Sequence, residues 1–171
     1  MIISDIYNML KEKFPSADLV MVENHPDQIM AVKSEDLVDA ATFLRDDENL
    51  AFNCLMCLTG METPTDLQVV YNLFSMKYRH KFSFKCGGSK EGKVEIPSLS
   101  SVWHTAEWHE REAYDFFGMT FTNHPDHRRI LLPDDWIGHP LRKDYVPQES
   151  WHGIPLTSLP TIQSEPAEEQ A

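Results

Sequence analysis

Helical and strand-forming stretches that do not alternate regularly predict an α+β fold: two helices packed on a mixed, mainly antiparallel sheet, followed by a helix and an extended C-terminal segment. Residues 2–14 and 34–45 place apolar side chains at helical spacing. Several stretches between residues 18 and 96 are rich in β-branched and aromatic residues or alternate between apolar and polar. After Pro97 the character of the chain changes.

The first expected helix covers residues 2–14 and ends before Pro15, which cannot continue it. Its apolar stripe consists of Ile2, Ile6, Met9, Leu10 and Phe14. Two short strands, Asp18–Glu23 and Gln28–Lys33, are expected next, joined by the turn-prone residues 24–27.

The second expected helix begins at Ser34, a good N-cap residue followed by two acids that suit a helix start. It ends near Arg45. Its apolar face consists of Leu37, Val38, Ala41 and Leu44.

Strands are expected over the rest of the first half. Residues 51–62 are mostly apolar and predict a buried strand, and residues 67–76 are strongly β-prone. His80–Cys86 alternates cleanly between apolar and polar and is expected to end at a turn formed by Gly87 and Gly88. Val94–Ile96 is expected to form a last short strand.

The composition divides the chain into three parts. Residues 1–97 are expected to form an α+β core domain. Residues 103–145 hold three of the four tryptophans and five of the eight histidines, so residues 98–150 are expected to form a helix and an extended contact segment. Residues 151–171 lose periodicity and contain Pro, Ser and Glu, which predicts a flexible or partner-draped tail.

Composition and charge exclude several classes of protein. A formal net charge of −12 argues against general nucleic-acid binding. No apolar run approaches the length of a membrane helix, and the amino-terminal residues lack the basic region of a secretory signal. Three cysteines, an odd number, indicate a reducing, intracellular setting without a disulfide framework.

The stretch WHEREAYDFFG predicts a helix that is apolar on two sides and ends at Gly118. One face carries Trp103, Ala106, Ala113, Tyr114 and Phe117, with Glu110 in its middle. The opposite side carries Trp108, Glu112 and Phe116. A surface helix with ordinary salt bridges is one interpretation. We favour a helix sandwiched between its own sheet and another protein, because a lone domain would leave the second aromatic face in water.

The charges of this helix predict a local network. Glu107 with Arg111, and Arg111 with Asp115, have the i,i+4 spacing of supporting ion pairs. A carboxylate in an apolar stripe, such as Glu110, is costly unless it is paired. Arg128 and Arg129 are the nearest cations in sequence that could neutralise an acid of the helix, and the sequence leaves open which arginine meets which acid.

Metal and redox chemistry find weak support in the sequence. His109-Glu110 begins like the HExxH motif of zinc proteases, but Ala113 stands where the second histidine would be. A metal site could draw on the histidines of the second half, His104, His109, His124, His127 and His139. The cysteines could suggest redox chemistry, because Cys54 and Cys57 have CxxC spacing and Cys86 is the third cysteine. All three are expected to be buried structural residues. In a strand, residues three apart point to opposite faces, so the CxxC sulfurs would diverge.

The second half of the chain resembles the 30-kilodalton class of respiratory complex I subunits, also called the C subunit. The family pattern is ERE, an acid with two apolar residues, a histidine, an arginine and an aliphatic residue at fixed spacing. The matching positions here are Glu110-Arg111-Glu112, Asp115-Phe116-Phe117, His124, Arg128 and Ile130. The downstream run LLPDDWIGHPLRKDY, residues 131–145, is similar to the continuation of the family pattern.

This resemblance implies a non-catalytic structural subunit of the peripheral arm of a proton-translocating NADH:quinone oxidoreductase. The expected partners are the large subunit that forms the quinone site and the subunit with the terminal iron–sulfur cluster. FMN, iron–sulfur clusters and quinone would belong to the complex, with no cofactor, metal or catalytic residue in this chain. The location implied is the cytoplasmic side of the cell membrane, peripheral and bound only through the complex. The alternatives are the corresponding subunit of a membrane-bound hydrogenase or ferredoxin-dependent complex, or a stand-alone His-rich metalloenzyme.

Two sets of site residues are expected. The structural charge network consists of Glu110, Arg111, Glu112, Asp115, Arg128 and Arg129. The residues that contact other subunits are Trp108, Phe116, His124, Asp134, Asp135, Trp136, Arg142, Lys143 and Tyr145.

Overall fold

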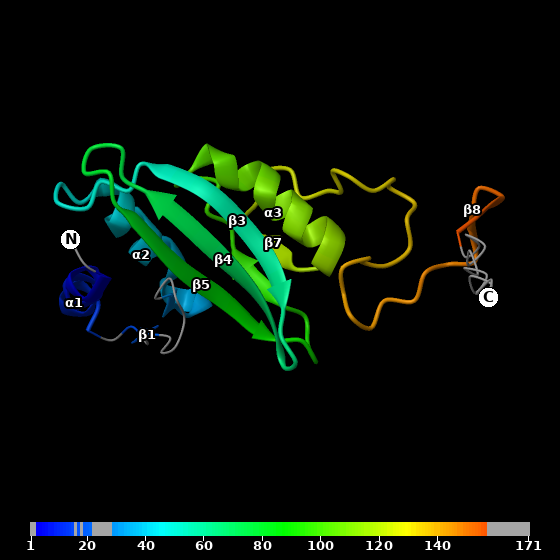
Figure 1. Cartoon of the computed structure of the whole chain (residues 1–171), viewed down its shortest axis with the longest axis horizontal. Coiled ribbons are helices and arrows are strands. Elements are labelled where there is room, and N and C mark those ends of the chain that lie inside the picture. Colours follow the sequence, from blue (N-terminus) through cyan, green and yellow to red (C-terminus); the bar gives the residue numbers. More distant parts are fainter. Residues whose placement is uncertain (1–2, 16, 18, 22–28, 157–171) are drawn as a thin grey trace, which may run out of the picture.

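A computed structural model describes all of the chain except residues 1–2, 16, 18, 22–28 and 157–171 (Figure 1). Its helices are α1 (Ile3–Lys13), the 3-10 helix η1 (Ser34–Asp36), α2 (Leu37–Asp46) and α3 (His104–Phe117). The main sheet consists of β1 (Val20–Met21), β2 (Met30–Ala31), β3 (Cys54–Glu62), β4 (Asp66–Phe74) and β5 (Lys81–Ser89). The expected first helix and the first two strands are therefore present, whereas Ile2 and the expected turn at residues 24–27 lie outside the described residues.

The five strands have the order β1-β2-β5-β4-β3. All neighbouring pairs are antiparallel except β2 and β5, which run parallel with Met30 opposite Phe84. Consecutive strands β3, β4 and β5 form a meander, while β2 reaches β5 only after the chain has passed through α2. The prediction of an α+β fold with a mixed, mainly antiparallel sheet is confirmed.

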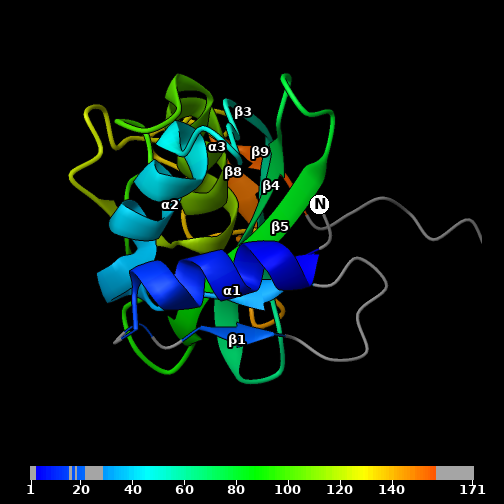
Figure 2. The same ribbon diagram turned by 90° about the vertical axis from the view of Figure 1, so that its left-hand side faces the viewer.

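The alternation of apolar residues decides which face of the sheet is buried. In β4 every second residue is buried, beginning with Leu67, and in β5 the buried residues alternate from Phe82 to Cys86. Helices α2 and α3 lie on one side of the sheet (Figure 2). Residues of α1 and α2, among them Ile6, Leu10 and Leu44, join the same buried apolar cluster, so one face of the sheet carries the core.

Two local predictions in this half are wrong. Ser34 does not cap α2, because the chain first forms η1 and the Ser34 hydroxyl lies 3.4 Å from Sγ of Cys86. Gly87 and Gly88 do not form a turn, because β5 continues through both to Ser89. Gly87 is required for another reason: a Cβ there would come within 2.3 Å of the backbone oxygen of Leu67 on β4.

Strand β3 is a partly exposed edge strand, not the buried strand expected from its composition. A β-bulge between Leu55 and Cys57 inserts one residue, so Leu55 and Leu58 both point into the core although they are three apart. Cys54 and Cys57 are both half-exposed, so the prediction that they are buried is wrong. Only Cys86 is a buried cysteine among the three.

The core continues into the second half of the chain. The expected strand at residues 94–96 appears as β6 (Glu95–Pro97). It pairs in parallel with β7 (Thr120–Thr122), which follows α3 in the sequence. The buried cluster extends to Phe121. It therefore crosses the expected domain boundary at residue 97.

After β7 the chain leaves this core as an extended segment, defined here as residues 123–149 (Figure 1). A small hairpin follows, formed by β8 (Ser150–Trp151) and β9 (Ile154–Pro155), and it crosses the expected boundary at residue 151. Most of the expected tail, residues 157–171, lies outside the described residues. None of the helices in the described part of the chain has both the length and the apolar character needed to span a bilayer.

Candidate functional site

Helix α3 packs along β3, the edge strand of the sheet (Figure 1). The Leu58 N–H donates to Nδ1 of His109 at 3.1 Å. Towards the other end of the helix, a Cβ on Gly60 would come within 2.8 Å of the Phe117 ring, so helix and strand are in close contact. Gly118 ends the helix in the left-handed region, with φ of +74°, as the sequence predicts.

The carboxylate of Asp115, in the last turn of α3, is fully buried and fastens the helix to the extended segment. Its Oδ1 accepts a hydrogen bond from Nη1 of Arg129 at 2.6 Å. Its Oδ2 accepts from three consecutive backbone N–H groups at 3.1, 2.8 and 2.8 Å, those of Ile130, Leu131 and Leu132. One side chain thus holds four donors and sets the conformation of this turn.

The surroundings of Asp115 favour its ionised form. Burial opposes ionisation, but the hydrogen bonds from the Leu132 N–H, from Arg129 and from the two neighbouring N–H groups outweigh it and hold the pKa of Asp115 below its ordinary value. Arg129 also donates through Nη2 to the backbone oxygens of Trp136 and Gly138, at 2.9 and 3.0 Å. The predicted charge network therefore exists around Asp115 and Arg129, and it reaches the middle of the extended segment.

Arg111 supports the same turn from one helical turn earlier. Its side chain is 6% exposed, and it donates to the backbone oxygens of Arg128 and Arg129 at 3.2 and 2.9 Å. Its Nη1 lies 3.4 Å from a carboxylate oxygen of Asp126, and its guanidinium lies 5.5 Å from the centre of the Trp108 ring. Arg128 contributes through its backbone, because its own exposed side chain pairs with Asp126 at 2.9 Å.

Glu110 does not belong to this network, which corrects the prediction. The buried carboxylate accepts from the Ser98 hydroxyl at 2.6 Å and from the Leu99 N–H at 2.7 Å. Both donors lie in the turn that precedes α3, whereas Arg128 and Arg129 follow β7 and bind acids elsewhere. The helix therefore has two separate buried acids, one for the turn before it and one for the turn after it.

The other predicted ion pairs of the helix are also absent from the described part of the chain. Glu112 is exposed and has no hydrogen bond or ion pair there, so it is not part of the network. Arg111 bonds neither Glu107 nor Asp115, the partners expected from i,i+4 spacing. Its guanidinium reaches the carbonyl groups of the following turn instead, because these lie over the same face of the helix.

Four of the five histidines singled out in the second half, all except the exposed His104, form hydrogen bonds within the chain. The His124 side chain is fully buried, with Nε2 2.9 Å from the backbone oxygen of Glu107 and Nδ1 accepting the Asp126 N–H at 3.0 Å. Because this side chain is covered within the chain, only the backbone of His124 could contact another subunit, and that contact stays a prediction. His127 accepts the Phe121 N–H through Nε2 at 3.1 Å. Among the described residues, no three His, Cys, Asp or Glu side chains are grouped so that they could hold a metal ion.

The extended segment exposes large apolar side chains. Val146 in the extended segment is 82% exposed, and Trp108 on α3 is 58% exposed. The exposed large apolar residues of the extended segment are Leu131, Ile137, Leu141 and Val146. Side chains of this kind on a segment whose backbone is fixed by buried charges indicate a surface for another protein.

The remaining residues expected to contact partners belong to α3 or to the extended segment. Asp135 accepts hydrogen bonds from Trp151 and His152, at 3.3 and 2.6 Å, and so ties the hairpin to the extended segment. Asp134 and Lys143 are exposed, whereas Phe116, Trp136, Arg142 and Tyr145 are half-buried. Their contact with other proteins stays a prediction.

Glu62, at the end of β3, also fastens the extended segment, a contact that sequence reasoning missed. Its Oε2 accepts the Lys143 N–H at 2.7 Å, and its Oε1 lies 3.2 Å from Nζ of Lys90. The hydrogen bond from the Lys143 N–H, more than the opposing effect of burial, lowers the pKa of Glu62. No local pattern could have identified this contact, because the two bonded residues are 81 positions apart.

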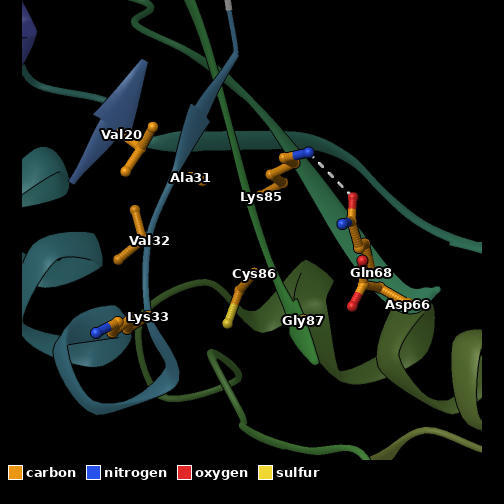
Figure 3. A pocket seen from close by; sticks show the side chains of 9 residues that line it. All are labelled: Val20, Ala31, Val32, Lys33, Asp66, Gln68, Lys85, Cys86 and Gly87. Carbon is orange, nitrogen blue, oxygen red and sulfur yellow. Dashed lines mark hydrogen bonds between the residues drawn. The ribbon is translucent and has the colours of Figure 1, made fainter. Parts of the chain in front are cut away.

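The main sheet also has a hollow of about 290 Å³, bordered by β1, β2, β4 and β5 (Figure 3). The Lys85 ammonium points across it to Oε1 of Gln68 at 3.1 Å, and Cys86 and Gly87 form part of its wall (Figure 3). The hollow contains no residue of α3 or of the extended segment. The network and the apolar surface therefore remain the candidate functional site.

Comparison with known proteins agrees with the motif around this site. The family model described as respiratory-chain NADH dehydrogenase, 30 Kd subunit, matches residues 30–151, and the chain belongs to this family. The C subunit of the NADH-quinone oxidoreductase of Chlorobium phaeobacteroides is 47% identical over 152 residues, which span 86% of this chain and 91% of that protein.

Two further comparisons describe the range of relatives. The corresponding NADH-quinone oxidoreductase protein of Chloroherpeton thalassium is 47% identical over 86% of this chain, which matches 62% of that longer protein. A solved structure of the membrane-bound sulfane sulfur reductase, an archaeal respiratory membrane complex, contains a chain that is similar with a TM-score of 0.62. That chain is 21% identical and 77% of each chain is covered, so this likeness concerns the fold alone.

Proposed function

We propose that the chain is a non-catalytic structural subunit in the peripheral arm of a proton-translocating NADH:quinone oxidoreductase, where it braces the large subunit that forms the quinone site. Family membership and the names of its relatives support this assignment. The single observation that carries the bracing role is the exposed apolar surface of the extended segment, held in place by the buried pair of Asp115 and Arg129.

The energetics of this surface support a permanent partner. Four large aliphatic side chains are available for burial, and each one that is fully covered stabilises a complex by roughly 1.5–3 kcal/mol. The buried charges fix the backbone before binding, so less conformational entropy is lost on association. A segment of this kind is better suited to an assembled particle than to a chain that works alone.

The chain would hold other subunits in position and would not take part in the reaction itself. Flavin, iron–sulfur clusters and quinone would be held by other subunits, and the nearest neighbours would be the quinone-site subunit and the subunit with the terminal cluster. The chain would reach the cytoplasmic side of the cell membrane only through these partners.

The test replaces the apolar surface without touching the core. The triple variant Ile137→Asp, Leu141→Asp, Val146→Asp is expected to fold with an unchanged melting temperature, because all three side chains are exposed. In its host it should be lost from the affinity-purified complex. The control Val20→Asp, exposed on β1 at the other end of the chain, should assemble normally. Incorporation of the triple variant at the wild-type level would contradict the proposal.

The same purification identifies the electron donor. Subunits that carry flavin and bind NADH would support the respiratory dehydrogenase. Hydrogenase or ferredoxin-dependent subunits in their place would assign the same bracing role to a different complex.

A further inference from the structure

Glu110 is a fully buried carboxyl group that no cation of the described residues contacts. Its donors are the Ser98 hydroxyl at 2.6 Å and the Leu99 N–H at 2.7 Å, both uncharged. Within the described part of the chain, the one basic group near it is Nε2 of His124, at 3.8 Å from Oε2, which is too far for a hydrogen bond. An ionised carboxylate is costly where it is buried without a cation, and such a group is usually protonated instead.

The bonds of His124 show that it does not supply the missing charge. Its Nδ1 accepts the N–H of Asp126 at 3.0 Å, so that nitrogen carries no proton. The single ring proton is then on Nε2, which donates to the backbone oxygen of Glu107 at 2.9 Å. A second proton would place two N–H groups against each other, so in this arrangement the imidazole beside Glu110 is neutral.

The other ionisable groups around Glu110 also fail to favour its charge. Glu107, on the same helix, raises the pKa of Glu110 by repulsion. Tyr71 reaches the site from β4, and its pKa is raised by burial, by Glu110 and by Cys86 of β5, so it stays neutral. The Tyr71 hydroxyl is buried and has no hydrogen-bond partner among the described residues.

A short chain of hydroxyl groups leads away from the carboxyl group. Ser98 Oγ lies 2.6 Å from Glu110 and 2.8 Å from Oγ of Ser100, whose N–H also donates to Ser98. When Glu110 is ionised, Ser98 donates to it and Ser100 donates to Ser98. When Glu110 is protonated, it donates to Ser98, and Ser98 donates to Ser100. Both protonation states are satisfied by rotating two hydroxyl groups, without moving a heavy atom.

We propose that Glu110, Ser98 and Ser100 form a proton-binding site that takes up one proton in the folded chain and makes the seating of α3 on the preceding turn pH-dependent. The site is separate from the network of Asp115 and Arg129, which holds the other end of the helix. It goes beyond the proposed function and does not depend on it, because it needs no partner.

The direction of the pH effect follows from the pKa of the buried Glu110 carboxyl group. Burial, more than the opposing hydrogen bonds from Ser98 and Leu99, raises the pKa of Glu110 from 4.5 to about 7. A raised pKa stabilises the folded chain fully below pH 4.5, and this contribution is lost as the pH rises to about 7. Above that pH the loss is complete and constant.

The test compares Glu110→Gln with the wild-type full chain in urea unfolding at a series of pH values. The amide cannot ionise, so the ratio of unfolding constants, wild type over variant, should rise with pH by up to about 300-fold between pH 4.5 and about 7. The matched control Glu112→Gln, exposed on the same helix, should keep a level ratio. A level ratio for Glu110→Gln would overturn the proposal.

A second measurement covers the case in which the Gln variant fails to fold. Carbon NMR of the wild-type chain with labelled glutamate carboxyl groups should show one resonance that titrates near neutral pH. That resonance should disappear from its position in Glu110→Asp. Titration of every glutamate resonance in the acidic range would overturn the proposal.

Discussion

Replacing Asp115 by Asn removes the charge that joins α3 to the extended segment while keeping the size of the side chain. The carboxylate serves four donors: Arg129 on one oxygen and three backbone N–H groups on the other. An amide has one oxygen and one NH2 group. Whichever way it points, the NH2 group faces donors, and either Arg129 or the three N–H groups lose their acceptor.

The magnitude follows from the burial of both partners. The Asp115 side chain is fully buried and that of Arg129 is 12% exposed. Removing one partner of a buried pair costs about 3–5 kcal/mol, because the other charge is left uncompensated. In a chain of this size that loss lowers the melting temperature by roughly 6–20 °C.

Thermal and urea unfolding of the isolated full chain, followed by circular dichroism, measures this loss. Glu112→Gln, on the solvent side of the same helix, is the control and should change the stability by less than about 0.5 kcal/mol. If Asp115→Asn destabilised the chain by less than about 1 kcal/mol, the four-donor arrangement would not be what holds the turn.

Two further substitutions test how the extended segment is fastened. Glu62→Ala should expose the Lys143 amide to faster hydrogen exchange, and in the wild type the same protection should be lost as the pH falls below 4.5, because the pKa of Glu62 is lowered. Protection that persists in the variant would mean that other contacts hold the segment. Gly118→Ala should cost about 1–3 kcal/mol in unfolding experiments, because φ is positive there and a Cβ would lie 2.6 Å from the His139 ring. Gly88→Ala, where a Cβ meets nothing within 4 Å, should be nearly neutral, and equal losses for both would refute this explanation.

Local periodicity predicted much of the fold because it reports burial directly. The alternation in β5 and the glycine at the end of α3 appear where the sequence predicts them. The family motif also led to the correct helix and placed Asp115 and Arg129 in one charge network, although it left open which arginine meets which acid. These signals work because each depends on residues that are close in sequence.

The errors came from contacts between distant residues. The bulge in β3 changes which side chains face the core, and no residue pattern within the strand predicts this bulge. Gly87 is needed because β4 approaches its backbone closely. Without knowledge of the partner strand, a glycine at this position looks like a turn signal. Glu110 bonds to the turn before α3 and not to the expected cations after the helix, because sequence distance does not tell which way a side chain of the helix faces.

Hydroxyl-radical footprinting tests most directly whether the second half of the chain is shaped to be covered by other subunits. The isolated chain and the purified complex are oxidised side by side. Trp108, Ile137 and Leu141 should react in the isolated chain and be protected in the complex, while Met76, 63% exposed after β4, serves as a reference outside this surface. Equal oxidation of the three side chains in both samples would contradict the claim.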